Sequence, residues 1–229
     1  MKTAGIIGGL GPETTAEFYQ EINFSCYALD KMARPPLLIW NVPLEYQIEY
    51  DLLVNNSGQE RYIPFLVEAA ERLERGGADF LVMPCNSLHI FITEIRAAVK
   101  IPVLSIVEET SRFLAEKGIK EVGILATSTT IDQGLYANSL EEFGIRQVVP
   151  DGLAQAKIGK TISNLVLSRH SNQDREELIT VIGGFADQGL KNVILACTDL
   201  QLLLPSHDQL QIFDTMKILA DATVREILG

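Results

Sequence analysis

Two stretches of the chain share one pattern: GADFLVMPCNSL at residues 77–88 and GLKNVILACTDL at residues 189–200. Each begins with a glycine, continues with a short apolar run that is typical of a buried strand, and reaches a cysteine eight residues after the glycine. Small polar residues follow both cysteines, and such residues favour turns and helix starts. One predicted strand ends at Cys85 and another at Cys197, which indicates that the chain contains the same strand-and-cysteine motif twice.

A second pair of similar stretches precedes the two cysteine motifs. AGIIGGLGPETT at residues 4–15 and VGILATSTT at 122–130 both run from glycine through apolar and small residues to Thr-Thr. Strand-like runs alternate with helix-like runs in both halves, which predicts parallel sheets built from βαβ units. We therefore expect two related α/β domains. The first comprises residues 1–110 with a C-terminal helix in 208–229, and the second comprises 111–207.

Several elements follow from local patterns. Residues 101–107, IPVLSIV, read as a fourth strand of the first half, and residues 87–99 as the helix after Cys85. Pro12 suits the first turn of a helix that follows the glycine-rich turn. An amphipathic helix is expected within 57–77, where one face carries four apolar residues: Leu66, Ala69, Ala70 and Leu73.

Composition excludes some classes of protein. The 229 residues are 47% hydrophobic, which is enough for a packed core. The net charge of -11 repels phosphate backbones, so we expect no nucleic-acid partner. No apolar run approaches the ~20 residues of a membrane helix, so no membrane contact is expected. Three cysteines in a chain of this length are no disulfide framework, which favours a reducing compartment, the cytoplasm.

Two thiols in equivalent positions suit one type of chemistry. Ligands of open parallel sheets bind beyond the carboxyl ends of the strands, where both cysteines fall. If the two halves face each other, one thiolate can remove a proton from a carbon while the other thiol returns a proton to the opposite face. A thiol pKa of about 8.5 falls at a helix N-terminus, and we expect Asn86-Ser87 and Thr198-Asp199 to cap helices there. Cys26 has no such partner motif and is expected in the core.

These motifs, GIIGGLGPETT, MPCNSLH, VGILATSTT and ACTDLQLL, resemble the aspartate/glutamate racemase family in order and over essentially the full length. The resemblance implies two Rossmann-like (flavodoxin-like) domains related by pseudo-two-fold symmetry, with the active site in the cleft between them. It implies racemisation of an amino acid without pyridoxal phosphate or another cofactor, with Cys85 and Cys197 as the two acid/base residues. It also implies a homodimer.

The same resemblance implies which residues bind the substrate. The residues expected to hold the α-carboxylate and the amino group of an amino acid are Asn86, Ser87, Thr127, Thr129 and Thr198. Aspartate racemases often carry an Arg in a Pro-Asp-Arg segment after the second strand, but here the segment NVPLEYQIEYD contains Glu45 and Glu49 and no Arg. Arg169 is the nearest candidate for a second cation.

The other titratable residues predict less. His89, His170 and His207 lie far apart in the sequence and show no metal-ligand spacing, so no metal site is expected. His89 follows Cys85 by four residues, where it either tunes the thiolate or is a half-buried histidine with satisfied hydrogen bonds. The start GGLGPET lacks the third glycine of a dinucleotide fingerprint, since Thr14 takes its place.

Two other functions fit the same pattern. One is a related isomerase or decarboxylase that uses a single cysteine, as maleate isomerases and arylmalonate decarboxylases of similar fold do. The other is a small-ligand-binding α/β protein without catalysis, because two α/β halves closing on a ligand also describe sensor modules.

Overall fold

The computed structural model describes residues 1–29, 34–55 and 57–229, which group into two compact units. The first unit comprises Met1–Glu109 and Met216–Gly229, and the second comprises Thr110–Thr215. The chain therefore passes between the units twice. The first passage lies inside helix α5 (Ile106–Glu116), and the second lies at the start of helix α10 (Thr215–Leu228).

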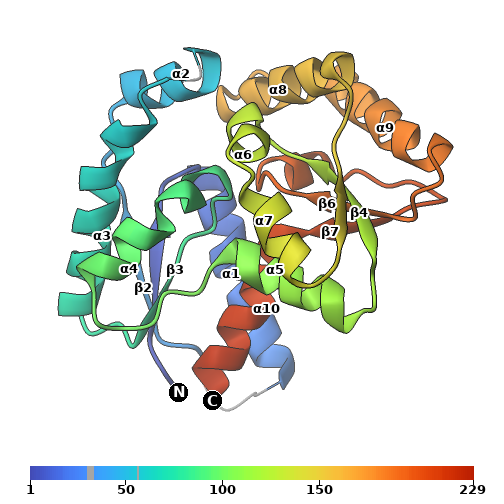
Figure 1. Ribbon diagram of the computed structural model, residues 1–229. Helices are drawn as coiled ribbons and strands as arrows, with labels where there is room; N and C mark the ends of the chain where they lie inside the picture. Colours follow the sequence, from blue (N-terminus) through green and yellow to red (C-terminus); the bar gives the residue numbers. More distant parts are fainter. Residues whose placement is uncertain (30–33, 56) are drawn as a thin grey trace. The chain divides into compact units, whose positions relative to one another are not determined.

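The first unit is built on a three-stranded parallel sheet in the order β2-β1-β3 (Figure 1). The strands are β1 (Ala4–Gly8), β2 (Leu37–Asn41) and β3 (Phe80–Val82). Ala4 pairs with Leu37 on one side and with Phe80 on the other. All of β1 and β3 is buried, as expected for apolar strands in the interior of a parallel sheet.

The helices of this unit follow the predicted pattern with some breaks. They are α1 (Pro12–Leu29), α2 (Tyr46–Asn55), α3 (Ile63–Arg75), α4 (Ile92–Ala98) and the one-turn helices η1 (Gln59–Tyr62) and η2 (Ser87–Phe91). Helix α1 begins at Pro12 as predicted, and its Cys26 is fully buried. Helix α3 buries the predicted face of Leu66, Ala69, Ala70 and Leu73.

The second unit carries a four-stranded parallel sheet in the order β5-β4-β6-β7. Its strands are β4 (Glu121–Leu125), β5 (Arg146–Val148), β6 (Asn192–Leu195) and β7 (Gln211–Asp214). Its other helices are α6 (Ser128–Asp132), α7 (Leu135–Glu142), α8 (Gly152–Val166), α9 (Asn172–Asp187) and the turn η3 (Leu200–Leu203). The Asp151 side chain caps α8, where it accepts from Ala154 N at 2.8 Å.

Both sheets use the same order of strands. In each unit the first strand lies in the middle, the second strand pairs with one side of it and the third with the other. Each cysteine motif follows the third strand, which is β3 in one unit and β6 in the other. The predicted α/β class with two parallel sheets is therefore confirmed.

Two predicted elements differ from the structure. Residues 101–107 form no strand, because only a single bridge joins Val103 to Leu81, and Pro102 has no N–H with which to extend a ladder. The predicted C-terminal helix is present as α10, which begins at Thr215, but Gln211–Asp214 before it form a strand, β7, that was not predicted. Phe213 of that strand is buried and meets the Phe113 ring edge-on at 5.6 Å.

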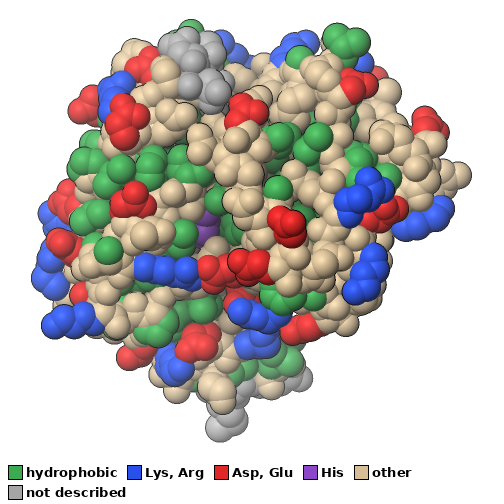
Figure 2. Space-filling model, in the orientation of Figure 1, with side chains coloured by type: hydrophobic (Ala, Val, Ile, Leu, Met, Phe, Trp, Pro, Cys, Tyr) green, Lys and Arg blue, Asp and Glu red, His purple; other side chains and the backbone are tan. Residues whose placement is uncertain are grey.

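The division between the units also assigns β7 to the second unit, whereas the second domain was expected to end at residue 207. The predicted domains, 1–110 with 208–229 and 111–207, stay a prediction. On the face shown in Figure 2, basic side chains are interspersed with acidic ones. Within residues 1–29, 34–55 and 57–229, no helix is long and apolar enough to cross a bilayer.

Candidate active site

Cys85 lies in a short loop at the carboxyl end of β3. Its N–H donates to Met83 O at 2.9 Å, which turns the chain sharply at the end of the strand. The residue is half-buried and has no disulfide partner. Because β3 pairs with β1, this loop lies at the same edge of the sheet as the glycine-rich turn after Gly8. The predicted position of Cys85 at a carboxyl strand end is confirmed.

The helix expected at 87–99 is present as the 3-10 segment η2 with α4 directly after it, but Asn86 does not cap it. A capping residue needs an extended backbone for its side chain to reach the N–H groups of the first turn. Asn86 has φ -70° and ψ -55°, which is already helical, so its side chain cannot take that role. The expectation that Asn86 caps a helix is therefore wrong, and the helical segment after the thiol begins in 3-10 geometry.

His89 lies in η2 and is 1% exposed. Its Nδ1 is 2.7 Å from Cys85 O, and its Nε2 accepts from Ile106 N at 3.1 Å. Burial lowers the pKa of His89 to about 4, against a smaller opposing effect of the hydrogen bond to Cys85. Of the two roles expected for His89, the structure therefore shows a fully buried histidine with both ring nitrogens bonded, and the ring is neutral at neutral pH.

Tyr62, at the end of η1, is a neighbour of Cys85 that the sequence did not indicate. It is 3% exposed and packs in the apolar cluster against which Cys85 lies. Burial raises the pKa of its hydroxyl, and the negative charges of Cys85 and Glu49 raise it further. Tyr62 therefore stays protonated as a neutral O–H donor near the sulfur. Nothing in its spacing could have revealed this, because it stands at the start of an ordinary amphipathic run.

Cys197 occupies the equivalent loop of the second unit, after β6. Ala196 N donates to Leu125 O at 2.8 Å, so the pairing of β4 with β6 continues to the residue before the cysteine. Cys197 is 6% exposed, and its Sγ donates to Asp199 Oδ2 at 3.6 Å. A carboxylate next to a sulfur favours the thiol over the thiolate, because the two negative charges repel each other.

Asp199 is another residue whose role differs from the prediction. It precedes the turn η3 with φ -80° and ψ -25°, a helical geometry in which its side chain makes no cap. The carboxylate turns to the thiol of Cys197 instead. The expected helix cap at Asp199 is therefore wrong, and the structure identifies a charged neighbour of the second cysteine.

Thr127 and Thr129 follow β4, the strand next to β6. Thr127 caps α6, where its Oγ1 accepts from Thr130 N at 3.3 Å, and Thr129 is 6% exposed. Because β4 and β6 are neighbours and parallel, the structure brings Thr127, Thr129, Cys197 and Thr198 to the same edge of this sheet.

The remaining predicted residues fall into two groups. Asn86 and Ser87 follow Cys85 directly, and Asn86 is 1% exposed. Arg169 is exposed in the turn after α8, where its N–H donates to Asn164 O. Near the other end of α8, the side chain of Gln155 donates to Ala126 O, in the loop after β4. The helix between Gln155 and Val166 is roughly 17 Å long. Arg169 therefore follows the opposite end of α8 from the residue that reaches the loop after β4.

The glycine-rich turn after β1 is shaped by close packing of the backbone. Gly9 has φ +84°, and a Cβ there would lie 2.7 Å from Asn41 Oδ1. Its N–H donates to Thr15 Oγ1 at 3.0 Å, which connects the turn to α1.

No group of three or more His, Cys, Asp or Glu side chains in the described part of the chain is arranged to hold a metal ion.

Comparison with known proteins now adds to this geometry. A sequence model of the Asp/Glu/Hydantoin racemase family matches residues 7–223. The chain belongs to this family. The broad specificity amino-acid racemase RacX of Bacillus subtilis is similar, with 28% identity over 230 residues that cover 98% of each protein.

Solved structures of racemases are similar over the whole chain as well. The aspartate racemase of Picrophilus torridus is 25% identical with a TM-score of 0.82, and the match covers 99% of this chain and 94% of that one. An aspartate racemase homologue from Pyrococcus horikoshii is 26% identical with a TM-score of 0.79 over 100% of both chains. The predicted family and the isomerase class of the enzyme are confirmed.

Proposed function

We propose that this racemase-family enzyme inverts the α-carbon of a free amino acid by two-base proton transfer between Cys85 and Cys197, without a cofactor. One observation carries the proposal: each cysteine follows the third strand of one of two sheets with the same strand order. A pair of bases in equivalent positions suits a reaction in which the substrate and the product are mirror images.

The proposed step conserves atoms and charge. The thiolate of one cysteine takes the α-proton, and the electron pair moves into the substrate carboxylate as an enolate. The thiol of the other cysteine then gives its proton to the opposite face of the carbon. The enzyme ends with the two protonation states exchanged. General acid–base catalysis supplies ~10²–10⁴-fold of the rate, so the enolate must also be stabilised electrostatically.

The candidate binding residues supply neutral hydrogen-bonding groups for that purpose. Asn86 and Ser87 beside Cys85, and Thr127, Thr129 and Thr198 in the second unit, are proposed to hold the carboxylate and the amino group. The mechanism requires that the two sulfurs reach opposite faces of one α-carbon. The proposed assembly is a homodimer in the cytoplasm, and sedimentation of the purified protein measures the number of subunits.

The surroundings of Cys85 also bear on the substrate. The negative charges of Glu49 and Cys85 raise the pKa of Tyr62, and Arg61, which lowers it, also pairs with Asp51 at 2.8 Å. A second carboxylate on the substrate would meet the negative charges of Glu49 and Cys85 here. We therefore propose that amino acids with uncharged or basic side chains react faster than aspartate and glutamate. The breadth named for the Bacillus relative is consistent with this choice.

Proton NMR in D2O tests the reaction and the substrate together. The purified, reduced protein is incubated with each L-amino acid in turn, and loss of the α-proton signal is followed alongside polarimetry. Loss of the signal for at least one amino acid, with formation of the D-enantiomer, is expected. If no amino acid in the panel exchanges its α-proton, the racemase proposal is wrong.

The unequal surroundings of the two cysteines favour one alternative enough to test it. Because Cys197 is buried and bonded to Asp199, the alternative is an isomerase or a decarboxylase that uses Cys85 alone, as nucleophile or as proton donor. A nucleophilic Cys85 predicts a covalent adduct when substrate is present, which mass spectrometry of the intact protein detects. Two-base racemisation predicts no adduct.

A further inference from the structure

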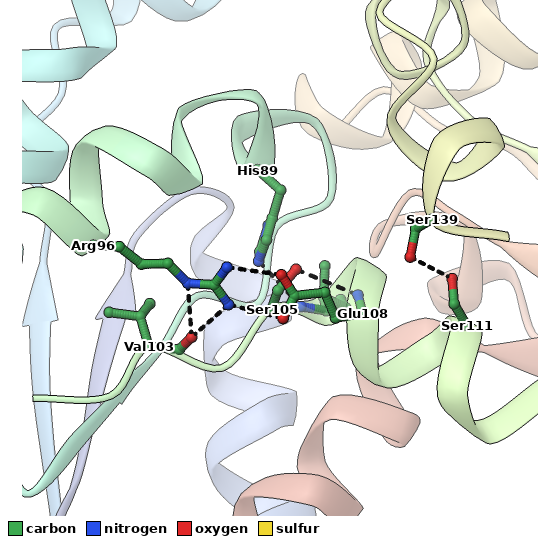
Figure 3. Close-up of polar contacts among 8 residues, drawn as sticks. His89, Arg96, Val103, Ser105, Glu108, Ser111 and Ser139 are labelled. Carbon is green, nitrogen blue, oxygen red and sulfur yellow. Dashed lines mark hydrogen bonds and ion pairs between the residues drawn. The ribbon is translucent and has the colours of Figure 1, made fainter. Parts of the chain in front are cut away.

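His89 joins two segments that lie far apart in the sequence. One ring nitrogen contacts the carbonyl of Cys85, and the other accepts from the backbone N–H of Ile106, seventeen residues along the chain. Both contacts lie within the first unit. Figure 3 shows the ring pointing from its own turn toward the start of α5.

Only one form of the ring can make both bonds. The N–H of Ile106 can only donate, so Nε2 of His89 must present a lone pair. The carbonyl of Cys85 can only accept, so Nδ1 must carry the hydrogen at 2.7 Å. The imidazole is therefore neutral with its proton on Nδ1, and a charged ring would face the N–H of Ile106 with a second N–H.

The bond to Cys85 replaces one that a regular helix would supply. In an α-helix the carbonyl of residue 85 would accept from the N–H of residue 89. Here the N–H of His89 donates to Asn86 O at 3.0 Å instead, because η2 is a 3-10 turn. The backbone N–H of His89 therefore does not bond to Cys85 O, and the side chain of His89 bonds to it instead. This bond holds the peptide between Cys85 and Asn86 in one orientation.

The other end of the contact is firmly held. Ile106 is the first residue of α5 and is fully buried, so its N–H needs an acceptor. Ser105 Oγ accepts from Glu108 N in the same turn at 3.4 Å. The guanidinium of Arg96 donates to both carboxylate oxygens of Glu108, at 2.7 and 2.8 Å, and also to Val103 O (Figure 3). The pair of Arg96 and Glu108 thus connects the start of α5 to α4.

We infer that His89 is a positioning residue for Cys85: its Nδ1–H holds the peptide after the cysteine, and its contact with the first turn of α5 sets the tautomer. The inference rests on the proposed role of Cys85 as an acid/base residue. The second cysteine is held differently, since Cys197 O accepts from the backbone N–H of Leu200 at 3.2 Å. A defect at His89 should therefore affect Cys85 and leave Cys197 unchanged.

Two substitutions separate the two bonds of the ring. In His89→Asn the amide nitrogen takes the place of Nδ1, so the bond to Cys85 is kept and the bond to Ile106 is lost. In His89→Gln the amide oxygen takes the place of Nε2, so the bond to Ile106 is kept and the bond to Cys85 is lost. His170→Gln, the same change at an exposed histidine, is the matched control.

Alkylation by iodoacetamide measures the effect on each sulfur within the same molecule. Peptide mass spectrometry gives the rates at Cys85 and Cys197 between pH 6 and pH 10. We expect the ratio of the two rates to change by more than about threefold in His89→Gln and by less than about twofold in His89→Asn and His170→Gln. Equal changes in both histidine-89 variants, or a change shared by both cysteines, would overturn the inference.

Kinetics and spectroscopy complete the test. If the cysteines racemise the substrate, kcat of His89→Gln should fall about 10–100-fold with little change in KM, since a small displacement of a reacting group costs this much. The ¹⁵N NMR spectrum of the unsubstituted protein should show a buried imidazole with its proton on Nδ1, and a proton on Nε2 would contradict the inference even if no variant folds. Because alkylation needs no turnover, failure of the racemase proposal would leave the alkylation ratios to decide the inference by themselves.

Discussion

The two cysteine loops occupy the same place in two sheets of the same order, yet their surroundings differ. Cys85 is half-buried, and the buried neutral ring of His89 holds its carbonyl. Cys197 is 6% exposed, and its thiol donates to the carboxylate of Asp199. The repeat therefore decides where each sulfur stands, while the residues that follow decide how each is held and which protonation state is favoured.

The largest effect should come from removal of either sulfur. Cys85→Ser and Cys197→Ser are each expected to lower the rate of racemisation by ~10³-fold or more, because a hydroxyl is a far weaker acid/base group than a thiol at neutral pH. Chiral chromatography measures the rate, and Cys26→Ser is the control for a cysteine in the core. Full activity in one variant would leave the other cysteine as the sole catalyst.

A large difference in pH dependence should follow from His89. Because burial lowers its pKa to about 4 from 6.5, the unfolded chain takes up a proton before the folded protein does as the pH falls. The free energy of unfolding should therefore be fully retained above about pH 6.5 and decrease toward pH 4, by about 3 kcal/mol in total. Urea unfolding at several pH values measures this decrease.

The corresponding variant isolates the contribution of the ring. The stability difference between the protein and His89→Gln should shrink by that amount between pH 6.5 and pH 4. His170→Gln, the same change at an exposed histidine, is the control. A difference that stays constant with pH would show that His89 is not held neutral.

Equivalent glycines in the first strands compare the packing of the two units. A Cβ at Gly5 would lie 2.8 Å from Ala78 Cβ, which is fixed to the backbone, whereas a Cβ at Gly123 would meet the Phe185 ring at 2.9 Å. Gly5→Ala should cost about 3 kcal/mol and Gly123→Ala about 1–2 kcal/mol, because a ring can shift more easily than a backbone. Thermal unfolding should therefore show the larger loss for Gly5→Ala.

A third glycine supplies the control for these two substitutions. A Cβ at Gly159, in α8, would meet no atom within 4 Å. Gly159→Ala should stabilise the protein by about 0.5–1 kcal/mol, since alanine restricts the unfolded chain and fits a helix. Equal losses at Gly5 and Gly123 would indicate that the two sheets are packed alike.

The smallest predicted effect concerns Asp199. Asp199→Asn keeps the shape of the side chain and removes its charge, so formation of the Cys197 thiolate should become easier. We expect alkylation of Cys197 to accelerate about three- to tenfold at neutral pH, as suits one charge at this distance near a protein surface. Cys85 in the same molecule is the internal control, and equal acceleration of both thiols would contradict a local effect.

Much of the fold could be read from the sequence because it depends on patterns along the chain. Apolar runs that end on Cys85 and Cys197 lie at carboxyl ends of parallel strands, as their alternation with helices predicts. The buried face of α3 and the start of α1 beyond the glycine-rich turn of β1 follow from spacing in the same way. Strand β7 was missed, because four residues with one buried aromatic carry too little pattern to separate them from the helix that follows.

The candidate site could be predicted only in part. Strand ends and motif spacing place the two cysteines, whereas the threonines after β4 were named through the resemblance to the racemase family. The structure brings these threonines to the same sheet edge as Cys197, because neighbouring parallel strands bring their carboxyl ends together. No pattern indicated Tyr62, which comes close to Cys85 through the packing of α3 on the sheet. The predicted caps at Asn86 and Asp199 failed because the backbone dihedrals there are helical, and residue type alone does not decide dihedrals.

The sequence by itself determined the family, the parallel α/β class and the position of one sulfur in each half, since these depend on order and spacing along the chain. Only the tertiary structure decided how each sulfur is held. The contact of His89 with Ile106 spans seventeen residues, and the turn of Asp199 toward Cys197 depends on local dihedral angles. Hydrogen bonds of this kind form between groups that folding brings together, so no periodicity of the sequence predicts them.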